Sequence, residues 1–268
     1  MPIRMLVSDV DGTLLAPDKS ISAASRRAIA KLHAVGIQFT VISGRPPRGM
    51  QFLVDPLGLT HPMAALNGAM ILWPNLSLLQ ATTMNPAVAA GVADIIRQHE
   101  LELWLYTISD WLVSDPQSPH VRHEVAVVQH EPALIADGGQ FPPSVTKVLG
   151  VSDDHPRVRR CEAAVLQQFS NQVSASRSQP HYLDVTAPSG DKGHGLAALS
   201  TVMGIELESI AVIGDGPNDI PMFHRAGLSI AMGNADQTVR QAARHVTDTN
   251  SDDGFAQAVE RFILPAAK

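Results

Sequence analysis

The sequence has little of several features that would place it in a specialised class. One cysteine, Cys161, stands among 268 residues, so no disulfide can form within the chain and a zinc site built on cysteines is excluded. We expect this thiol to lie on a helix as a packed or half-buried side chain. No apolar stretch approaches the roughly 18 residues that a membrane span needs, and the N-terminal residues lack the pattern of a signal peptide. The expected compartment is the cytoplasm.

Basic residues are too few for a nucleic-acid-binding protein. Lys and Arg total 20 against 26 Asp and Glu, a formal net charge of −6, whereas phosphate-backbone binding needs a basic surface. Repeats and low-complexity segments are absent too. The composition is otherwise that of an ordinary globular protein, and the chain is long enough for a core domain with a smaller second domain. A negatively charged protein that holds a phosphate anion needs a metal ion and a few placed donors to offset the repulsion.

The two ends of the chain alternate short apolar runs with helical patterns. Near the N-terminus the runs cover 3–7, 37–42 and 64–66, and a helix between the first two has Ser22 as its cap and Gly36 as its stop. The C-terminal third repeats the alternation, with runs at 210–213, 228–231 and 245–247 and helices near 195–203, 220–225 and 254–263. Such alternation predicts a right-handed parallel α/β layer.

The middle of the chain has a different pattern. Residues 101–107 and 111–114, joined by Ser109-Asp110, predict a hairpin. Further strands are expected at 145–151, 173–178 and 181–186, and helices near 86–99, 119–128 and 158–169. We therefore predict an α/β fold with a Rossmann-like parallel-sheet core formed by residues 1–82 and 189–268, into which an α+β cap domain, residues 83–188, is inserted.

Acidic residues follow two of the predicted core strands. Asp9 and Asp11, in the hexamer 9–14, can face one site because side chains two apart on a strand point the same way. Gly12 allows a sharp turn there. The segment 214–219, which contains Asp215 and Asp219, likewise ends a strand and precedes a helix. Carboxylates that meet at one sheet edge repel one another unless a hard cation is present, and oxygen ligands favour magnesium.

Two further segments offer groups that could hold a phosphate. Ser43-Gly44, at the end of the second apolar run, supplies a hydroxyl and a free backbone N–H. Lys192, before a predicted helix, is the only candidate cation that we can place near the two acidic strand ends. Each of these segments alone is more typical of a turn or a solvated surface than of a site.

The four segments together resemble the ordered motifs of the haloacid dehalogenase superfamily, and more narrowly the Cof-type phosphatases with a type IIB cap. The motifs are Asp9-Val10-Asp11-Gly12-Thr13, Ser43-Gly44-Arg45, Asp191-Lys192-Gly193 and Gly214-Asp215-Gly216-Pro217-Asn218-Asp219. Three shorter segments, 67–69, 232–235 and 252–254, also match habits of that group. Two departures are Ser43, where many relatives have threonine, and Gly216-Pro217, where more polar pairs are common. The second departure puts contacts around the metal in doubt.

The resemblance implies a fold, a cofactor and residue roles. It implies a HAD-like core and a phosphatase in which Asp9 attacks phosphorus and Asp11 acts as general acid and then base. Magnesium would bind the Asp9 carboxylate, the Asp11 backbone carbonyl and Asp215, with support from Asp219. The groups expected to hold the phosphate are Val10, Ser43, Gly44, Lys192 and Asn218.

Several alternatives stay open at this point. A phosphomutase would use the same motifs, and a non-catalytic phospho-acceptor module would share the sheet type; a dinucleotide-binding fold is the weakest rival, because no Gly-x-Gly-x-x-Gly follows the first strand. The expected partner is a small phosphorylated metabolite, a sugar phosphate or similar phosphomonoester, with no nucleic acid and no membrane. We expect a monomer or a weak homodimer.

Histidines and cap residues carry no clear assignment in the sequence. Asp110 and His181 could contact a substrate but are as expected for ordinary surface or turn residues. His120 and His123 lack a partner set for zinc, and we predict surface positions for both.

Overall fold

A computed structural model describes residues 1–128, 130–136 and 141–267, and its core is a five-stranded parallel sheet. The strand order is β14-β13-β12-β1-β2, so that β1 lies between strands from both ends of the chain. The bounds of these strands are Met5–Ser8 (β1), Gln38–Val41 (β2), Ile210–Gly214 (β12), Leu228–Ala231 (β13) and His245–Val246 (β14). The parallel α/β layer predicted from the sequence is confirmed.

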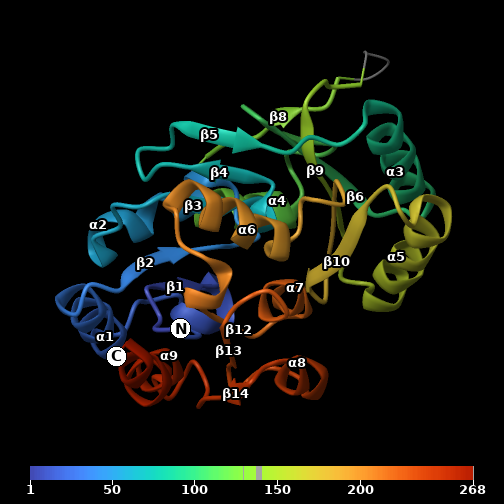
Figure 1. Ribbon diagram of the computed structural model, residues 1–268. Helices are drawn as coiled ribbons and strands as arrows, with labels where there is room; N and C mark the ends of the chain where they lie inside the picture. Colours follow the sequence, from blue (N-terminus) through green and yellow to red (C-terminus); the bar gives the residue numbers. More distant parts are fainter. Residues whose placement is uncertain (129, 137–140, 268) are drawn as a thin grey trace.

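Helices cover both faces of this sheet, and the alternation of side chains along the strands explains why. Leu6 belongs to one buried cluster and Met5 and Val7 to another, so β1 is apolar on both faces, as buried parallel strands are. Helices α1 and α9 pack together against the first face, and α6 and α7 lie on the second (Figure 1). The bounds of the core helices are Ala23–Ala34 (α1), Val54–Leu57 (α2), Lys192–Met203 (α6), Ile220–Phe223 (α7), Gln237–Ala242 (α8) and Gly254–Ala258 (α9).

The apolar run near residue 64 does not become a full strand of the parallel sheet. It forms β3 (Met63–Ala65), which touches the parallel layer through a single bridge between Ile42 and Ala64. Its other pairing is antiparallel, with β4 (Met70–Leu72), which in turn pairs with β5 (Leu78–Ala81). The bridge to Ile42 is parallel, and helix α2 lies between β2 and β3, so the predicted third parallel strand is confirmed at this one bridge. The antiparallel pairing with β4 was not predicted, and it forms because the short segment after β3 turns back at once.

The middle of the chain forms a second, six-stranded sheet of order β10-β11-β9-β6-β7-β8. Its strands are Glu102–Thr107 (β6), Trp111–Val113 (β7), Ala133–Leu134 (β8), Val145–Val151 (β9), Ser174–Gln179 (β10) and Tyr182–Thr186 (β11). The predicted hairpin is β6 and β7, which pair antiparallel. Strand β8 lies outside what the sequence predicted.

The two faces of this second sheet differ. Helices α3 (Pro86–Gln98) and α5 (His155–Phe169) pack on one face, over a cluster that includes Leu103, Val148 and Val185. The opposite face carries Trp104, Tyr106 and Leu149 and belongs to the cluster of the parallel sheet's first face. Helix α4 (Pro119–Val128) packs against the 3-10 turn Pro47–Leu53 of the core. This face of the second sheet therefore looks toward the carboxyl ends of the parallel strands.

Two remaining features concern the whole chain. Among the described residues, no helix combines the length and apolar character required to cross a membrane. Cys161 lies buried on α5, as predicted.

Candidate active site

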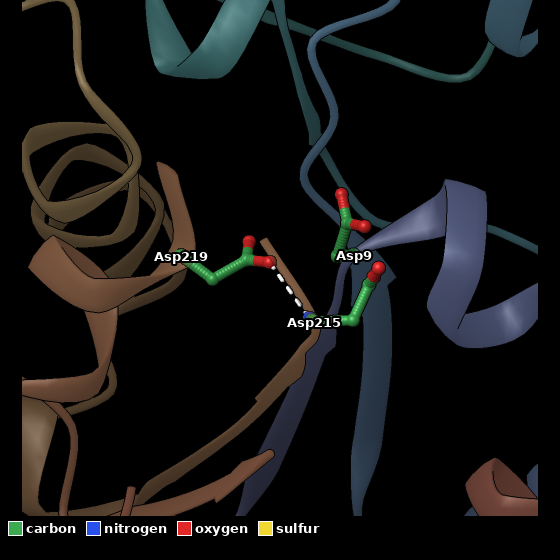
Figure 2. Close-up of side chains that lie close together, drawn as sticks. All are labelled: Asp9, Asp215 and Asp219. Carbon is green, nitrogen blue, oxygen red and sulfur yellow. Dashed lines mark hydrogen bonds between the residues drawn. The ribbon is translucent and has the colours of Figure 1, made fainter. Parts of the chain in front are cut away.

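Three carboxylates meet at the carboxyl ends of β1 and β12. Asp9 follows β1 directly, Asp215 follows β12, and Asp219 lies one turn further on. Each offers a carboxylate oxygen within 4.8 Å of the other two. In Figure 2 the carboxylates of Asp9 and Asp215 lie side by side, and that of Asp219 points toward them. The predicted convergence of the first and last motifs is therefore present in the structure.

Lys192 joins two members of this cluster. Its Nζ donates to Asp9 Oδ1 at 2.5 Å and to Asp219 Oδ1 at 2.6 Å, and its side chain is only 1% exposed. A buried lysine is tolerated because both neighbours are anionic, and their charges raise its pKa against the opposing effect of burial. Lys192 is the first residue of α6, whose N-terminus is capped by Asp191 through His194 N at 2.8 Å. The cap fixes where the lysine leaves the helix.

Two glycines make room for the carboxylates. Gly12 has a φ of +81°, and a Cβ there would lie 2.3 Å from Asp215 Oδ2, so a side chain is excluded twice over. Gly214 likewise leaves space for Asp219, because a Cβ added at Gly214 would lie 2.3 Å from Asp219 Cγ. The glycines of both acidic motifs are therefore explained by the close approach of neighbouring side chains.

Asp219 and Thr13 fix the geometry around Asp215. Asp219 Oδ2 accepts from the backbone N–H of Asp215 at 2.9 Å (Figure 2). It also accepts from Gly216 N at 2.8 Å, and Asp219 Oδ1 accepts from Lys192. Both oxygens of Asp219 are therefore engaged, which suits a residue that orients the cluster. The Thr13 hydroxyl donates to Asp215 Oδ1 at 2.6 Å.

The predicted phosphate-binding groups lie around this cluster with different degrees of exposure. Ser43 and Gly44 line the same cleft as Asp9, Asp11, Asp215 and Asn218. The Ser43 hydroxyl accepts from Arg45 N at 3.2 Å, and Asn218 Nδ2 donates to Asn67 Oδ1 at 3.0 Å. The Val10 side chain is fully buried, so its backbone is the part available to a ligand.

Asp11 lies in a different environment from Asp9. Arg45 forms a two-pronged ion pair with it, through Nε to Oδ2 at 2.6 Å and Nη2 to Oδ1 at 2.9 Å, and Lys19 donates to Oδ1 at 2.8 Å. Burial acts to raise the pKa of Asp11, but these hydrogen bonds and charges outweigh it and hold the pKa at about 2. Asp11 is therefore ionised in this arrangement.

The prediction that Lys192 is the only cation near the acidic strand ends was wrong. Arg45, Lys19 and Lys147 line the same cleft. Arg45 belongs to the second sequence motif, but the motif does not indicate that its side chain pairs with Asp11. Lys147 lies within β9, about a hundred residues further along the chain. Only the packing of the second sheet over the core brings Lys147 to Gly44, whose carbonyl accepts from its Nζ at 3.1 Å.

Burial and mutual repulsion raise the pKa of two of the three clustered carboxyl groups. Burial raises the pKa of Asp9 well above its ordinary value, and Asp219 and Asp215 raise it further, against the lowering effect of Lys192. Burial and Asp219 likewise raise the pKa of Asp215 to about 6. Lys192 alone does not offset three carboxylates, and a bound divalent cation would.

The donor set fits magnesium. The ligands on offer are carboxylate oxygens, which hard cations prefer, and no sulfur or imidazole joins the cluster among the described residues. Asp9 and Asp215 are the two carboxylates positioned to bind such an ion directly, since Asp219 has its oxygens engaged elsewhere.

A cleft of about 360 Å³ extends from the cluster to the second sheet. That volume suits a small metabolite. The second sheet and α4 contribute the far wall, which is formed by Tyr106, His123, Glu124, Val127, Lys147, Leu149, Ser178, Gln179, His181 and Tyr182. Most of these residues could not be predicted from the sequence, because they come from separate strands and a helix with no shared motif.

The histidines and Asp110 differ in whether they lie at the cleft. His123 and His181 both line the cleft. His123 is exposed, which confirms its predicted surface position, whereas His181 is half-buried and lies where a substrate contact is possible. Asp110 is exposed in the β6–β7 turn, where its backbone N–H donates to Thr107 Oγ1 at 2.9 Å. His120 has two carboxylate partners outside the cleft lining, Glu102 at 2.7 Å and Asp153 at 3.2 Å.

Comparison with known proteins gives consistent matches along the chain. A family model described as haloacid dehalogenase-like hydrolase matches residues 6–259. A 5-amino-6-(5-phospho-D-ribitylamino)uracil phosphatase of Bacillus subtilis, YcsE, is 26% identical over 98% of this chain and 96% of its own length. The pyridoxal phosphate phosphatase YbhA of Escherichia coli is 26% identical over 98% of this chain and all (100%) of its own.

A solved structure shares the fold over nearly the whole chain. The structure of a sugar phosphatase of HAD subclass IIB superimposes with a TM-score of 0.86, at 23% identity, over 97% of this chain and 98% of its own.

Proposed function

The chain belongs to the haloacid dehalogenase-like hydrolases and is a phosphomonoester hydrolase for small phosphorylated metabolites, and from this premise we propose a magnesium-dependent mechanism with an aspartyl-phosphate at Asp9. The observation that supports it most is the meeting of Asp9, Lys192 and Asp215 at one sheet edge. The attacking carboxylate and the phosphate dianion are both negative, so positive charge beside them is needed to offset their repulsion. Lys192 would supply part of this charge, and a cation held by the carboxylates would supply the rest.

In the first step, a carboxylate oxygen of Asp9 forms a bond to phosphorus and the bond from phosphorus to the alcohol oxygen breaks. Asp11 gives that oxygen its proton. In the second step, water attacks phosphorus, Asp11 takes the proton of the water, and the bond to Asp9 breaks to release inorganic phosphate. Magnesium, held by Asp9, Asp215 and the Asp11 carbonyl, would supply charge neutralisation at the phosphoryl group.

The ion pair between Asp11 and Arg45 bears on this cycle. The ionised Asp11 suits the second step, in which it accepts a proton, whereas the first step requires a protonated carboxyl group. A phosphate dianion in the cleft competes with Asp11 for Arg45, and loss of that partner raises the pKa of Asp11. Arg45 thus links the arrival of substrate to the proton that the first step needs.

The phosphate would be held by neutral donors and Lys192. Ser43, Gly44 and Asn218 line the cleft beside Asp9, and the backbone N–H of Val10 follows the nucleophile. We propose further that residues 83–188 form a cap that selects the organic part of the substrate and excludes water during transfer. Support comes from the six-stranded sheet, all of whose strands lie within this range.

The substrate would be a sugar phosphate or a similar phosphomonoester. Another candidate is a vitamin-related phosphate like those after which the relatives YcsE and YbhA are named. The test is a phosphate-release screen over such a panel, with and without magnesium and with no added acceptor. We expect magnesium-dependent release of inorganic phosphate. Transfer of the phosphoryl group to a second hydroxyl without release would favour a mutase, and a long-lived phospho-adduct would favour a phospho-acceptor module.

A further inference from the structure

The wall of the cleft that the second sheet and α4 contribute has a distinct chemical character. Tyr106, Val127, Leu149 and Tyr182 give it an apolar surface, and Glu124, Lys147 and Ser178 supply its charged and hydroxyl groups. A substrate whose phosphate is at Asp9 has its organic part against this wall. That placement rests on the proposed function, and the charges of the wall then decide which substrates bind.

The positive charge of Lys147 is already neutralised within the protein. Its Nζ donates to Asp184 Oδ1 at 2.8 Å, both side chains are no more than 4% exposed, and the second Asp184 oxygen accepts from Ser178. The ammonium also lies 4.8 Å from the centre of the Tyr106 ring. Lys147 therefore has a buried anionic partner, Asp184, before any ligand binds.

Glu124 is in the opposite situation. Within the described parts of the chain, no cation lies within ion-pair distance of its carboxylate, and its hydrogen-bond partner is the Tyr182 hydroxyl at a long 3.5 Å. Burial raises the pKa of Glu124, against the lowering effect of Lys147 and Arg45. Such a carboxylate gains most from a ligand that donates hydrogen bonds or carries positive charge, and it repels a ligand with a second anionic group.

The packing of helix α4 fixes the position of the Glu124 carboxylate. Val121 and Val128 are buried, so the helix is anchored at both ends, and Val128 lies against Gly49 of the core. His123 and Val127, one turn apart, line the cleft on either side of Glu124. The position of Glu124 is thus fixed by packing in both the cap and the core.

We propose that Glu124 is the specificity residue of this site and selects phosphomonoesters whose organic part carries hydroxyl or amino donors and no second anionic group. The residue touches the part of the substrate that leaves, so its effect appears in the ranking of substrates. It takes no part in the transfer itself.

The test compares Glu124→Gln with the wild type on three sugar phosphates whose organic parts carry a positive charge, no charge and a negative charge. These are glucosamine 6-phosphate, glucose 6-phosphate and 6-phosphogluconate, with p-nitrophenyl phosphate as a substrate that has no hydroxyl donors. The matched control is Glu131→Gln, which removes the same charge from an exposed position outside the cleft. The readout is kcat/KM for each substrate.

For the wild type we expect kcat/KM to fall in that order, with 6-phosphogluconate at least about tenfold below glucose 6-phosphate. Glu124→Gln should narrow the ratio between glucose 6-phosphate and 6-phosphogluconate about tenfold, mainly through KM, and should change kcat/KM for p-nitrophenyl phosphate less than for the sugar phosphates. Glu131→Gln should behave as the wild type. An unchanged ratio in Glu124→Gln, or a wild type that prefers 6-phosphogluconate, would overturn the inference, whereas failure to hydrolyse any substrate, p-nitrophenyl phosphate included, would overturn the proposed function instead.

Discussion

Asp9, Lys192 and Asp219 form a buried row of alternating charges at the end of β1. None of the three could remain charged alone, because each is at most 6% exposed and an isolated buried ion is costly. The same row fixes the direction in which the Asp9 carboxylate points. Structural pairing and the proposed reactivity of Asp9 therefore share one set of contacts.

The first residue-scale prediction concerns Asp9→Asn. The amide keeps the shape of the side chain but is a poor nucleophile, so we expect phosphate release to fall by about 10³-fold or more. The fold should persist because Lys192 keeps Asp219 as a partner. Steady-state kinetics and circular dichroism check the two parts, and near-normal turnover in a folded variant would remove Asp9 from its role.

The second concerns Cys161. Burial, with a smaller effect from Glu162, raises the pKa of this thiol to about 12. A raised pKa means that its contribution to stability is present below the ordinary thiol range, near pH 9, and is lost as the pH rises toward 12.

At pH 8 the thiol is therefore protonated as well as buried, and we expect Ellman's reagent to label it only after unfolding in guanidinium chloride. The Cys161→Ala variant should show no labelling in either condition. Rapid labelling of the native wild type at pH 8 would contradict the assignment.

The residues that the sequence predicted share one property: each lies at the end of a core strand or the start of a helix, within a short recognisable motif. Arg45 was in such a motif, but its pairing with Asp11 depends on a turn that no periodicity reveals. Glu124 and Lys147 lie in the middle of regular elements. Their role arises only when a cap element folds over the core, which is a tertiary event without a local signal.

At the scale of elements, periodicity located the long strands and helices well and failed where elements are short. The bounds of α4 and β9 are as predicted, at Pro119–Val128 and Val145–Val151. Strands β4 and β5, of three and four residues, were not predicted. Such short segments have too few side chains for an alternation to be visible, and their pairing is decided by neighbours.

Helix α1 offers a prediction at this scale. The Ser22 hydroxyl accepts from Ser25 N at 3.0 Å and caps the helix, as the sequence predicted. Ser22→Ala should lower the free energy of unfolding by about 1 kcal/mol with no change in kcat/KM, and Ser22→Asp should retain most of the stability. Urea titration measures both, and equal stability of the alanine and aspartate variants would show that the cap contributes nothing.

The pair of Lys147 on β9 and Asp184 on β11 offers another. Lys147→Met leaves Asp184 buried without its cation, and we expect a loss of about 3–5 kcal/mol in the free energy of unfolding. The double variant Lys147→Met, Asp184→Leu should recover much of this loss, because no charge remains buried. A single variant as stable as the wild type would show that the pair is not coupled.

At the scale of the whole molecule, two parts of the chain remote in sequence form one sheet (Figure 1). Residues of the second sheet form one wall of the cleft at the edge of this sheet. The sequence predicted this arrangement, because apolar runs alternate with helical patterns at both ends of the chain and the middle of the chain interrupts that alternation. The division at residues 83–188 and the expected monomer or weak homodimer stay predictions.

Magnesium should stabilise the whole molecule. A cation that binds the folded site and not the unfolded chain adds about 2.7 kcal/mol at a hundred times its Kd, so thermal unfolding should shift upward with magnesium. Asp215→Asn should abolish most of this shift, because Asp215 is one of the two carboxylates positioned to bind the ion. An equal shift in Asp215→Asn and wild type would place the ion elsewhere.

The most direct test of the account is chemical trapping of the intermediate. Asp11→Asn should still be phosphorylated by p-nitrophenyl phosphate, whose leaving group needs no proton, but should release the phosphate slowly. Reduction of the trapped acyl phosphate with borohydride converts the modified aspartate to homoserine, which mass spectrometry can locate. We expect homoserine at position 9; a modification at another residue, or phosphate release by this variant with no adduct formed, would contradict Asp9 as the nucleophile.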